Sequence, residues 1–134
     1  MNTRLSAVLF ALLALVAAPA QAAPPPQAER EIEQLIAALA RSGCQFQRNG
    51  SWYDAGQAQA HLRKKYAYLR KRDMVASAEQ FIERAGSESS MSGRAYQIRC
   101  GTAAALPSAN WLRARLNEIR GKPAAKPAAA PPPR

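Results

Sequence analysis

Only the middle of this sequence can build a globular core, because the two ends have compositions unsuited to one. Residues 1–22 start with one cation, continue as an apolar run of about 14 residues, too short to cross a bilayer comfortably, and end in Ala-Gln-Ala. This order is typical of a cleavable secretory signal peptide, with an uncleaved anchor as the alternative. Residues 122–134 contain only Pro, Ala, Lys and Arg, which predicts a disordered tail. We therefore expect a short linker at residues 23–27 and one domain at residues 28–121.

Export changes the interpretation of the two cysteines, Cys44 and Cys100. An even number of cysteines in an exported chain favours a disulfide, and closing a loop this long stabilises a small domain by roughly 4 kcal/mol. The alternatives are a redox site or a metal site. Redox catalysis usually uses Cys-x-x-Cys, and structural zinc needs about four ligands, whereas this chain has two distant cysteines and one histidine. We therefore expect a structural disulfide and no metal or cofactor.

Hydrophobic spacing predicts a mostly helical α+β domain with about four helices. Apolar residues recur at helical spacing in four segments, at about residues 28–41, 55–72, 78–85 and 109–120. Strands are expected at residues 44–47 and 95–100, and the Asn49-Gly50 turn signal predicts that residues 51–53 continue the first strand as a hairpin. The sequence therefore predicts a small antiparallel sheet of two or three strands, joined by the disulfide.

Three of the predicted helices also have start signals. Asp54, with Gln57 three residues later, predicts a capping box for the second helix. Ser77 and Ser108 are the predicted N-caps of the third and fourth helices.

A strong positive charge indicates anionic partners. The whole chain has a formal net charge of +10, or +9 once Arg4 is removed with the signal peptide. Such a charge favours nucleic acid, membrane headgroups or acidic glycans, and export makes nucleic acid the least available of these. Helix periodicity places five polar or aromatic residues on the face of the second helix away from the core: His61, Lys64, Tyr68, Lys71 and Arg72. An ordinary solvated basic face is the simplest interpretation of this group.

The one histidine, His61, is the candidate for acid–base chemistry. A general base needs an orienting acid and a nucleophile nearby, but Asp54 lies at the predicted cap and reaches His61 only if the cap bends back. The sequence contains no Gly-x-Ser-x-Gly, His-Glu-x-x-His, P-loop or Gly-x-Gly-x-x-Gly motif. These features favour a non-catalytic protein over an enzyme.

Several short strings, taken together, resemble a known family. They are Cys44-Gln-Phe46-x-Arg48-Asn49-Gly50, Asp54-Ala55, His61-Leu62-Arg63-x-Lys65-Tyr66, Ser77-Ala78-Glu79-Gln80-Phe81-Ile82, Ser92-Gly93-x-x-Tyr96-x-Ile98-x-Cys100 and Pro107-Ser108-x-x-Trp111-Leu112. In this order, over residues 29–120, they resemble the YfeK-like family of small exported proteobacterial proteins of unknown function. The resemblance implies a periplasmic location in a Gram-negative cell and supports the pairing of Cys44 with Cys100.

The resemblance also selects candidate binding residues within its recurring strings. They are Arg48, Asn49, His61, Lys65, Ser92 and Tyr96. We expect a non-catalytic periplasmic protein that binds an anionic envelope partner, either peptidoglycan, lipopolysaccharide, anionic lipid or another periplasmic protein, with no transmembrane segment after signal cleavage. The alternative is a small hydrolase or lyase of envelope polymers that uses His61 as its acid/base.

Overall fold

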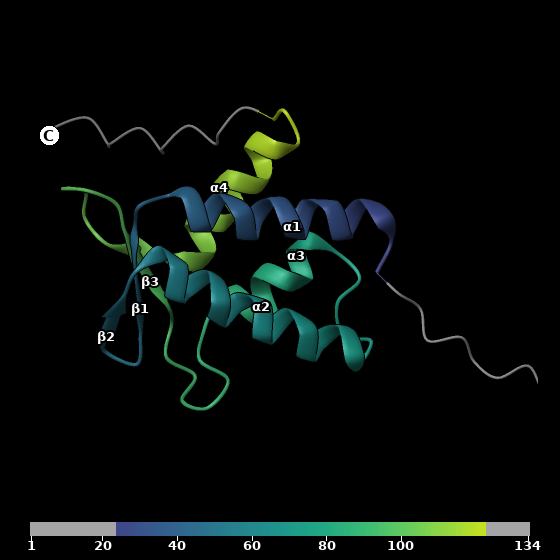
Figure 1. Ribbon diagram of the computed structural model, residues 1–134, viewed down its shortest axis with the longest axis horizontal. Helices are drawn as coiled ribbons and strands as arrows, with labels where there is room; N and C mark the ends of the chain where they lie inside the picture. The colour runs from purple at the N-terminus through teal and green to yellow at the C-terminus, as the bar shows by residue number, and fades with distance from the viewer. Residues whose placement is uncertain (1–23, 123–134) are drawn as a thin grey trace, which may run out of the picture.

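The structure is a computed structural model that describes residues 24–122. The expected signal peptide and all but the first residue of the expected tail lie outside these residues. Within the described range the elements are α1 (Pro26–Arg41), β1 (Gln45–Arg48), β2 (Ser51–Tyr53), α2 (Ala55–Lys71), α3 (Ala78–Phe81), the π-helical turn η1 (Ile82–Gly86), β3 (Gln97–Arg99), β4 (Leu106–Pro107) and α4 (Ser108–Ile119) (Figure 1). None of the helices in this part of the chain has the length and apolar character needed to span a bilayer.

The long helices α1 and α2 lie side by side and supply eight of the nineteen residues of the core cluster (Figure 1). Helix α1 begins at Pro26, two residues earlier than expected, because proline is well suited to a first helical turn, where its missing N–H is not needed. Its predicted apolar stripe is buried: Ile32, Leu35, Ile36 and Leu39. The predicted capping box of α2 is confirmed, since Asp54 accepts from the backbone N–H of Gln57, and the Gln57 side chain accepts from the backbone N–H of Asp54.

The third predicted helix changes its winding partway. Ser77 caps α3 as expected, accepting from the backbone N–H of Gln80. The helix then continues as η1, a wider π-helical turn that ends at Gly86. Gly86 lies so close to Leu112 of α4 that a side chain at this position would overlap it. This close approach joins the third helix to α4.

The prediction that Ser108 caps α4 is wrong. The residue preceding the helix is Pro107, and no side chain caps this end. Ser108 is instead the first residue of the helix, where its side chain is buried and its backbone N–H donates to the carbonyl of Tyr96.

The sheet has four antiparallel strands in the order β2-β1-β3-β4, rather than the two or three expected. The additional strand, β4, has only two residues, one of them a proline, which cannot donate to a strand ladder and is confined to sheet edges. In the central pair, Phe46 of β1 faces Ile98 of β3, and both side chains are buried. One face of the sheet therefore belongs to the same core as the helices.

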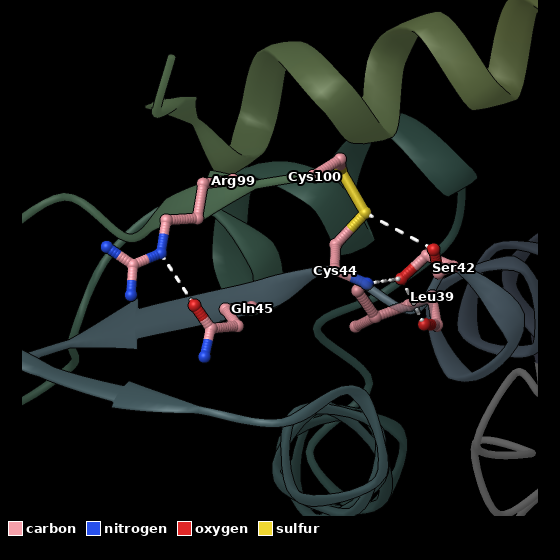
Figure 2. The surroundings of a disulfide bond; sticks show 6 residues. All are labelled: Leu39, Ser42, Cys44, Gln45, Arg99 and Cys100. Atoms are coloured by element: carbon pink, nitrogen blue, oxygen red, sulfur yellow. Dashed lines mark hydrogen bonds between the residues drawn. A yellow bond between two sulfur atoms is a disulfide. The ribbon is translucent and has the colours of Figure 1, made fainter. Parts of the chain in front are cut away.

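The predicted disulfide between Cys44 and Cys100 is confirmed (Figure 2). Cys44 comes just before β1 and Cys100 just after β3, next to the paired residues Gln45 and Arg99. The bond thus fastens the two central strands at one end, and Ser42 secures the adjoining end of α1 by accepting from the Cys44 backbone N–H. The result is an α+β fold, as the sequence predicts.

Candidate functional site

Four of the six predicted site residues, Arg48, His61, Lys65 and Tyr96, form one hydrogen-bonded network. Arg48, at the end of β1, places its Nη1 atom 3.2 Å from Nδ1 of His61 on α2. The other ring nitrogen of His61, Nε2, lies 3.0 Å from the hydroxyl oxygen of Tyr96. Lys65, one turn beyond His61, places its Nζ 3.2 Å from the same oxygen. The hairpin, α2 and the segment before β3 therefore meet at this network.

The direction of each hydrogen bond follows from the chemistry of the groups. A guanidinium has donors and no acceptor, so Arg48 donates and Nδ1 of His61 accepts. In the neutral ring the proton is then on Nε2, which donates to the hydroxyl oxygen of Tyr96. Lys65 donates to that oxygen and to the backbone carbonyl of Glu88, at 2.9 Å. Tyr96 thus accepts two hydrogen bonds here.

Electrostatics keeps His61 neutral at neutral pH. Burial, and after it the charges of Arg48, Lys65 and Lys64, together lower the pKa of His61 from 6.5 to about 4. Burial also lowers the pKa of Lys65, with Glu88 opposing the shift, and raises the pKa of Tyr96. A neutral imidazole is the form that the hydrogen-bond directions require, and the raised pKa of Tyr96 keeps its phenol protonated at neutral pH.

The network of Arg48, His61, Lys65 and Tyr96 has more hydrogen-bond donors than acceptors. Within residues 24–122, neither Arg48 nor Lys65 has a carboxylate within 4.0 Å. Five of the nine acidic residues pair with other cations instead: Glu29, Glu31, Glu33, Glu79 and Glu118. The remaining donors of the arginine and the lysine are therefore suited to oxygen atoms of a ligand.

The other two predicted residues, Asn49 and Ser92, lie beside this network and have a positioning role. Ser92 donates its hydroxyl to the side-chain oxygen of Asn49 at 2.6 Å, and the Asn49 amide donates to the hydroxyl of Ser89 at 3.4 Å. Asn49 has a φ of 50°, in the left-handed region that asparagine tolerates in tight turns. These bonds tie the hairpin turn, and with it Arg48, to the loop of residues 87–94.

A groove of about 790 Å³ runs along α2 beside the hydrogen-bonded network. One wall is a stripe of α2 residues at helical spacing: His61, Lys64, Lys65, Tyr68 and Leu69. Arg48 closes one end, and the opposite wall comes from the segments after α2: Met74, Glu83, Arg84, Glu88 and Ser90.

Helix periodicity predicts only part of this groove. Lys64 and Tyr68 line it, whereas Lys71 and Arg72 of the same predicted face are exposed outside it. His61 is half-buried rather than on a solvated face, because the segment carrying Tyr96 covers it. The wall formed by η1 and the loop has no sequence signal, since it depends on how distant segments pack.

A second hollow, of about 560 Å³, lies between α1 and the end of α4. The guanidinium of Arg120 lines it but is already paired with Glu31 and Glu79. The donors of Arg120 are thus occupied within the protein, while Arg30 and Lys122 line the same hollow.

The groups at the groove are poorly suited to proton transfer at neutral pH. A base with a pKa of about 4 is weak at neutral pH. Asp54 does not orient His61, since its carboxylate accepts from the backbone N–H of Gln57 at 2.8 Å. No cluster of three or more metal-ligating side chains occurs in the part of the chain that the structure describes.

Comparison with known proteins gives two matches over nearly the whole fold. A family model described as "Family of unknown function (DUF5329)" matches residues 26–120. A relative from Salmonella typhimurium, "Uncharacterized protein YfeK", is 37% identical over 91 residues, which are 67% of this chain and 72% of the relative. No solved structure matches this chain. The matched range covers every element from α1 to α4.

Proposed function

We propose, on the premise that this chain belongs to the DUF5329 family of YfeK-like proteins, that it is a non-catalytic periplasmic protein that binds an anionic component of the cell envelope. The binding site is the groove along α2, with Arg48 and Lys65 at its anion-binding end. Neither family description names an activity, so the proposal rests on the residues of this chain.

The excess of donors at the groove carries the proposal. Arg48 bonds His61, and both His61 and Lys65 bond the hydroxyl of Tyr96. Among residues 24–122 no carboxylate lies within 4.0 Å of Arg48 or Lys65, and Glu88 in the groove wall offsets part of the charge of Lys65. Two cationic side chains, Arg48 and Lys65, held by a folded scaffold bind an anion with little entropy cost of gathering them. Charge-assisted bonds to a carboxylate or phosphate are also the strongest that these side chains form.

The disulfide supports an envelope location. A disulfide that fastens the centre of a sheet persists in an oxidising compartment such as the periplasm and is rare where thiols are kept reduced. The pattern of residues 1–22 points to the same compartment. Export limits the anions within reach to peptidoglycan, lipopolysaccharide and anionic lipids.

A second candidate function is a small hydrolase or lyase of envelope polymers that uses His61 as its acid/base. The observation that favours it is the bond between His61 and Tyr96 beside the groove, because imidazole and phenol are both proton-transfer groups. The low pKa of His61 favours the binding function instead.

Retention of the purified, disulfide-bonded protein on peptidoglycan, lipopolysaccharide and phosphatidylglycerol vesicles, at low salt and at 0.5 M salt, tests the binding function. We expect retention on at least one of them that weakens in high salt. Lys64→Met removes a charge from the groove, and Lys71→Met removes the same charge from the same helix outside it. Lys64→Met should weaken retention more. Equal effects of the two variants, or no retention at all, would contradict the proposal.

His61→Gln separates the two candidate functions. Glutamine can accept from Arg48 and donate to Tyr96, as neutral histidine does, but it cannot transfer a proton. A binding protein should keep its retention with this change. Loss of an envelope-polymer cleavage activity, with an unchanged thermal melt, would support the enzyme instead.

A further inference from the structure

The two ends of the groove along α2 differ in chemistry. Arg48, His61 and Lys65 lie at the end near the hairpin, and Tyr68, Leu69 and Met74 lie toward the end of α2. His61 and Leu69 are separated by about 12 Å along the helix axis, from the rise of 1.5 Å per residue. The groove thus has the cationic donors of Arg48 and Lys65 near the hairpin, and the apolar side chains of Tyr68, Leu69 and Met74 farther along α2. Glu83 and Arg84 line the wall opposite α2.

Two of the three exposed large apolar side chains of the described residues line this groove. Three large apolar residues are exposed between residues 24 and 122, namely Tyr68 at 53%, Met74 at 39% and Met91 at 97%. Tyr68 and Met74 line the groove, and Met91 is at the tip of the loop whose residues Glu88 and Ser90 form its wall. In Figure 1 this loop descends beside α2. Exposed apolar groups that cluster mark binding surfaces more often than scattered ones do.

A ligand that fits both ends must be amphiphilic. An inorganic anion or a small acid leaves the apolar end empty, and a neutral hydrocarbon leaves the charged donors without partners. Methionine adapts to apolar groups of varied shape, so Met74 suits a flexible chain. The ring of Tyr68 is held by Arg72, whose guanidinium carbon lies 3.8 Å from the ring centre. Arg84 also lines the groove and donates to the backbone carbonyl of Met74. The apolar surface of Tyr68 and Met74 therefore lies beside two guanidinium groups, each already engaged by one of these residues.

We propose that the groove holds a monomeric single-chain amphiphile, with its acidic head against Arg48 and Lys65 and its apolar chain along Tyr68 and Met74. This inference rests on the proposed function and names the class of its ligand. The observation that favours one molecule within the groove over a membrane surface is the position of the apolar residues: two of the three line a hollow of about 790 Å³.

Calorimetry on the disulfide-bonded protein tests this with three probes: dodecyl phosphate below its micellar concentration, inorganic phosphate and dodecyl maltoside. We expect dodecyl phosphate to bind at least about tenfold more tightly than inorganic phosphate, which has no chain to bury. It should also bind at least about tenfold more tightly than dodecyl maltoside, whose uncharged head cannot form charge-assisted bonds with Arg48 and Lys65. Equal binding of the two phosphates would overturn the amphiphile and leave an anion site. Equal binding of dodecyl phosphate and dodecyl maltoside would overturn the proposed anion-binding function itself.

Two methionine variants distinguish a groove from a membrane surface. Met74→Gln, inside the groove, should weaken dodecyl phosphate binding about three- to tenfold. Met91→Gln, outside it, should leave that binding unchanged. If Met91→Gln instead abolished sedimentation with phosphatidylglycerol vesicles while monomeric dodecyl phosphate failed to bind, the partner would be a membrane surface and the inference wrong.

Discussion

The Nε2 atom of His61 lies 3.0 Å from the hydroxyl oxygen of Tyr96, although 35 residues separate the two along the chain. Arg48 occupies the other ring nitrogen of the histidine, at 3.2 Å. Since a guanidinium cannot accept a hydrogen bond, the structure requires the neutral ring with its proton on Nε2. The only histidine of the chain is thus a fixed donor to Tyr96.

We predict that His61 titrates with a pKa of about 4 in the folded protein, because burial and the charges of Arg48, Lys65 and Lys64 oppose its protonation. With one histidine in the sequence, a single set of imidazole NMR signals reports this directly. Arg48→Gln should raise the pKa toward 6.5, whereas Arg41→Gln, a change of equal charge at the exposed end of α1, should not. A pKa near 6.5 in the unmodified protein would show that the contact with Arg48 does not persist in solution.

The same shift predicts a loss of stability in acid. Because the folded pKa of His61 is lowered, the unfolded chain takes up a proton below pH 6.5 while the folded protein does not, until about pH 4. The free energy of unfolding should fall over this range by about 1–2 kcal/mol, a figure reduced for solvent screening of a half-exposed group. In His61→Gln the fall should be smaller by that amount in denaturant titrations at each pH. Glu79, whose pKa is lowered by Arg120, contributes equally to both proteins and cancels.

Two buried tyrosines should respond oppositely to loss of the hydroxyl. Tyr96→Phe removes the acceptor of both His61 and Lys65, and we expect it to lower the free energy of unfolding by about 1–2 kcal/mol. The hydroxyl of Tyr66 is buried without a partner in the described structure, so Tyr66→Phe should be neutral or stabilising. Chemical denaturation of the two variants checks this, and a greater loss in Tyr66→Phe would contradict the assignment of partners.

The disulfide should account for a large share of the stability. Replacing both Cys44 and Cys100 by alanine should lower the free energy of unfolding by up to about 4 kcal/mol, because the bond closes a long loop. Reduction by dithiothreitol should lower the melting temperature of the unmodified protein but not of the double variant. A melt unaffected by reduction, with free thiols detected, would show that the bond adds little.

The ion pair between Glu31 and Arg120 should contribute more to the free energy of unfolding than an exposed ion pair does. Glu31 is only 7% exposed and accepts from two nitrogens of Arg120, which also bonds Glu79. Glu31→Gln should cost about 1–3 kcal/mol in unfolding free energy, because it leaves the guanidinium less compensated. Glu118→Gln breaks the exposed pair with Arg115 and should cost about 0.5 kcal/mol or less. Similar losses in both would indicate that burial of Glu31 does not strengthen its pair.

The local parts of the fold and the disulfide that joins two distant strands were predictable from the sequence, whereas the other non-local contacts described above were not. The apolar stripe of α1, the capping box at Asp54 and the Asn49-Gly50 turn each depend on neighbours within a few residues, and all are confirmed. Strand β4 had no signal, because two residues including a proline have neither alternation nor a full set of donors. The π-helical turn has the composition of an ordinary helix, and its widening accompanies the close contact of Gly86 with Leu112.

The candidate site was predictable as a set of residues but not as an arrangement. The six residues selected from the recurring strings all lie within one region, yet only the folded chain shows that Asn49 and Ser92 position the hairpin while Arg48, His61, Lys65 and Tyr96 share hydrogen bonds. Counting residues around a helix placed His61 on a solvated face, because such counting cannot include a segment that packs over the helix from elsewhere.

The strand order has a consequence for how the chain folds. Strand β1 is central in the finished sheet, but its partner β2 follows after a tight turn, whereas β3 begins only at Gln97. A hairpin closes in about 1–10 μs, while the second pairing waits for a long loop to close, which is slower. Until then the open edge of β1 can pair with another copy of the chain. Refolding without the disulfide should therefore lose more protein to aggregation as concentration rises.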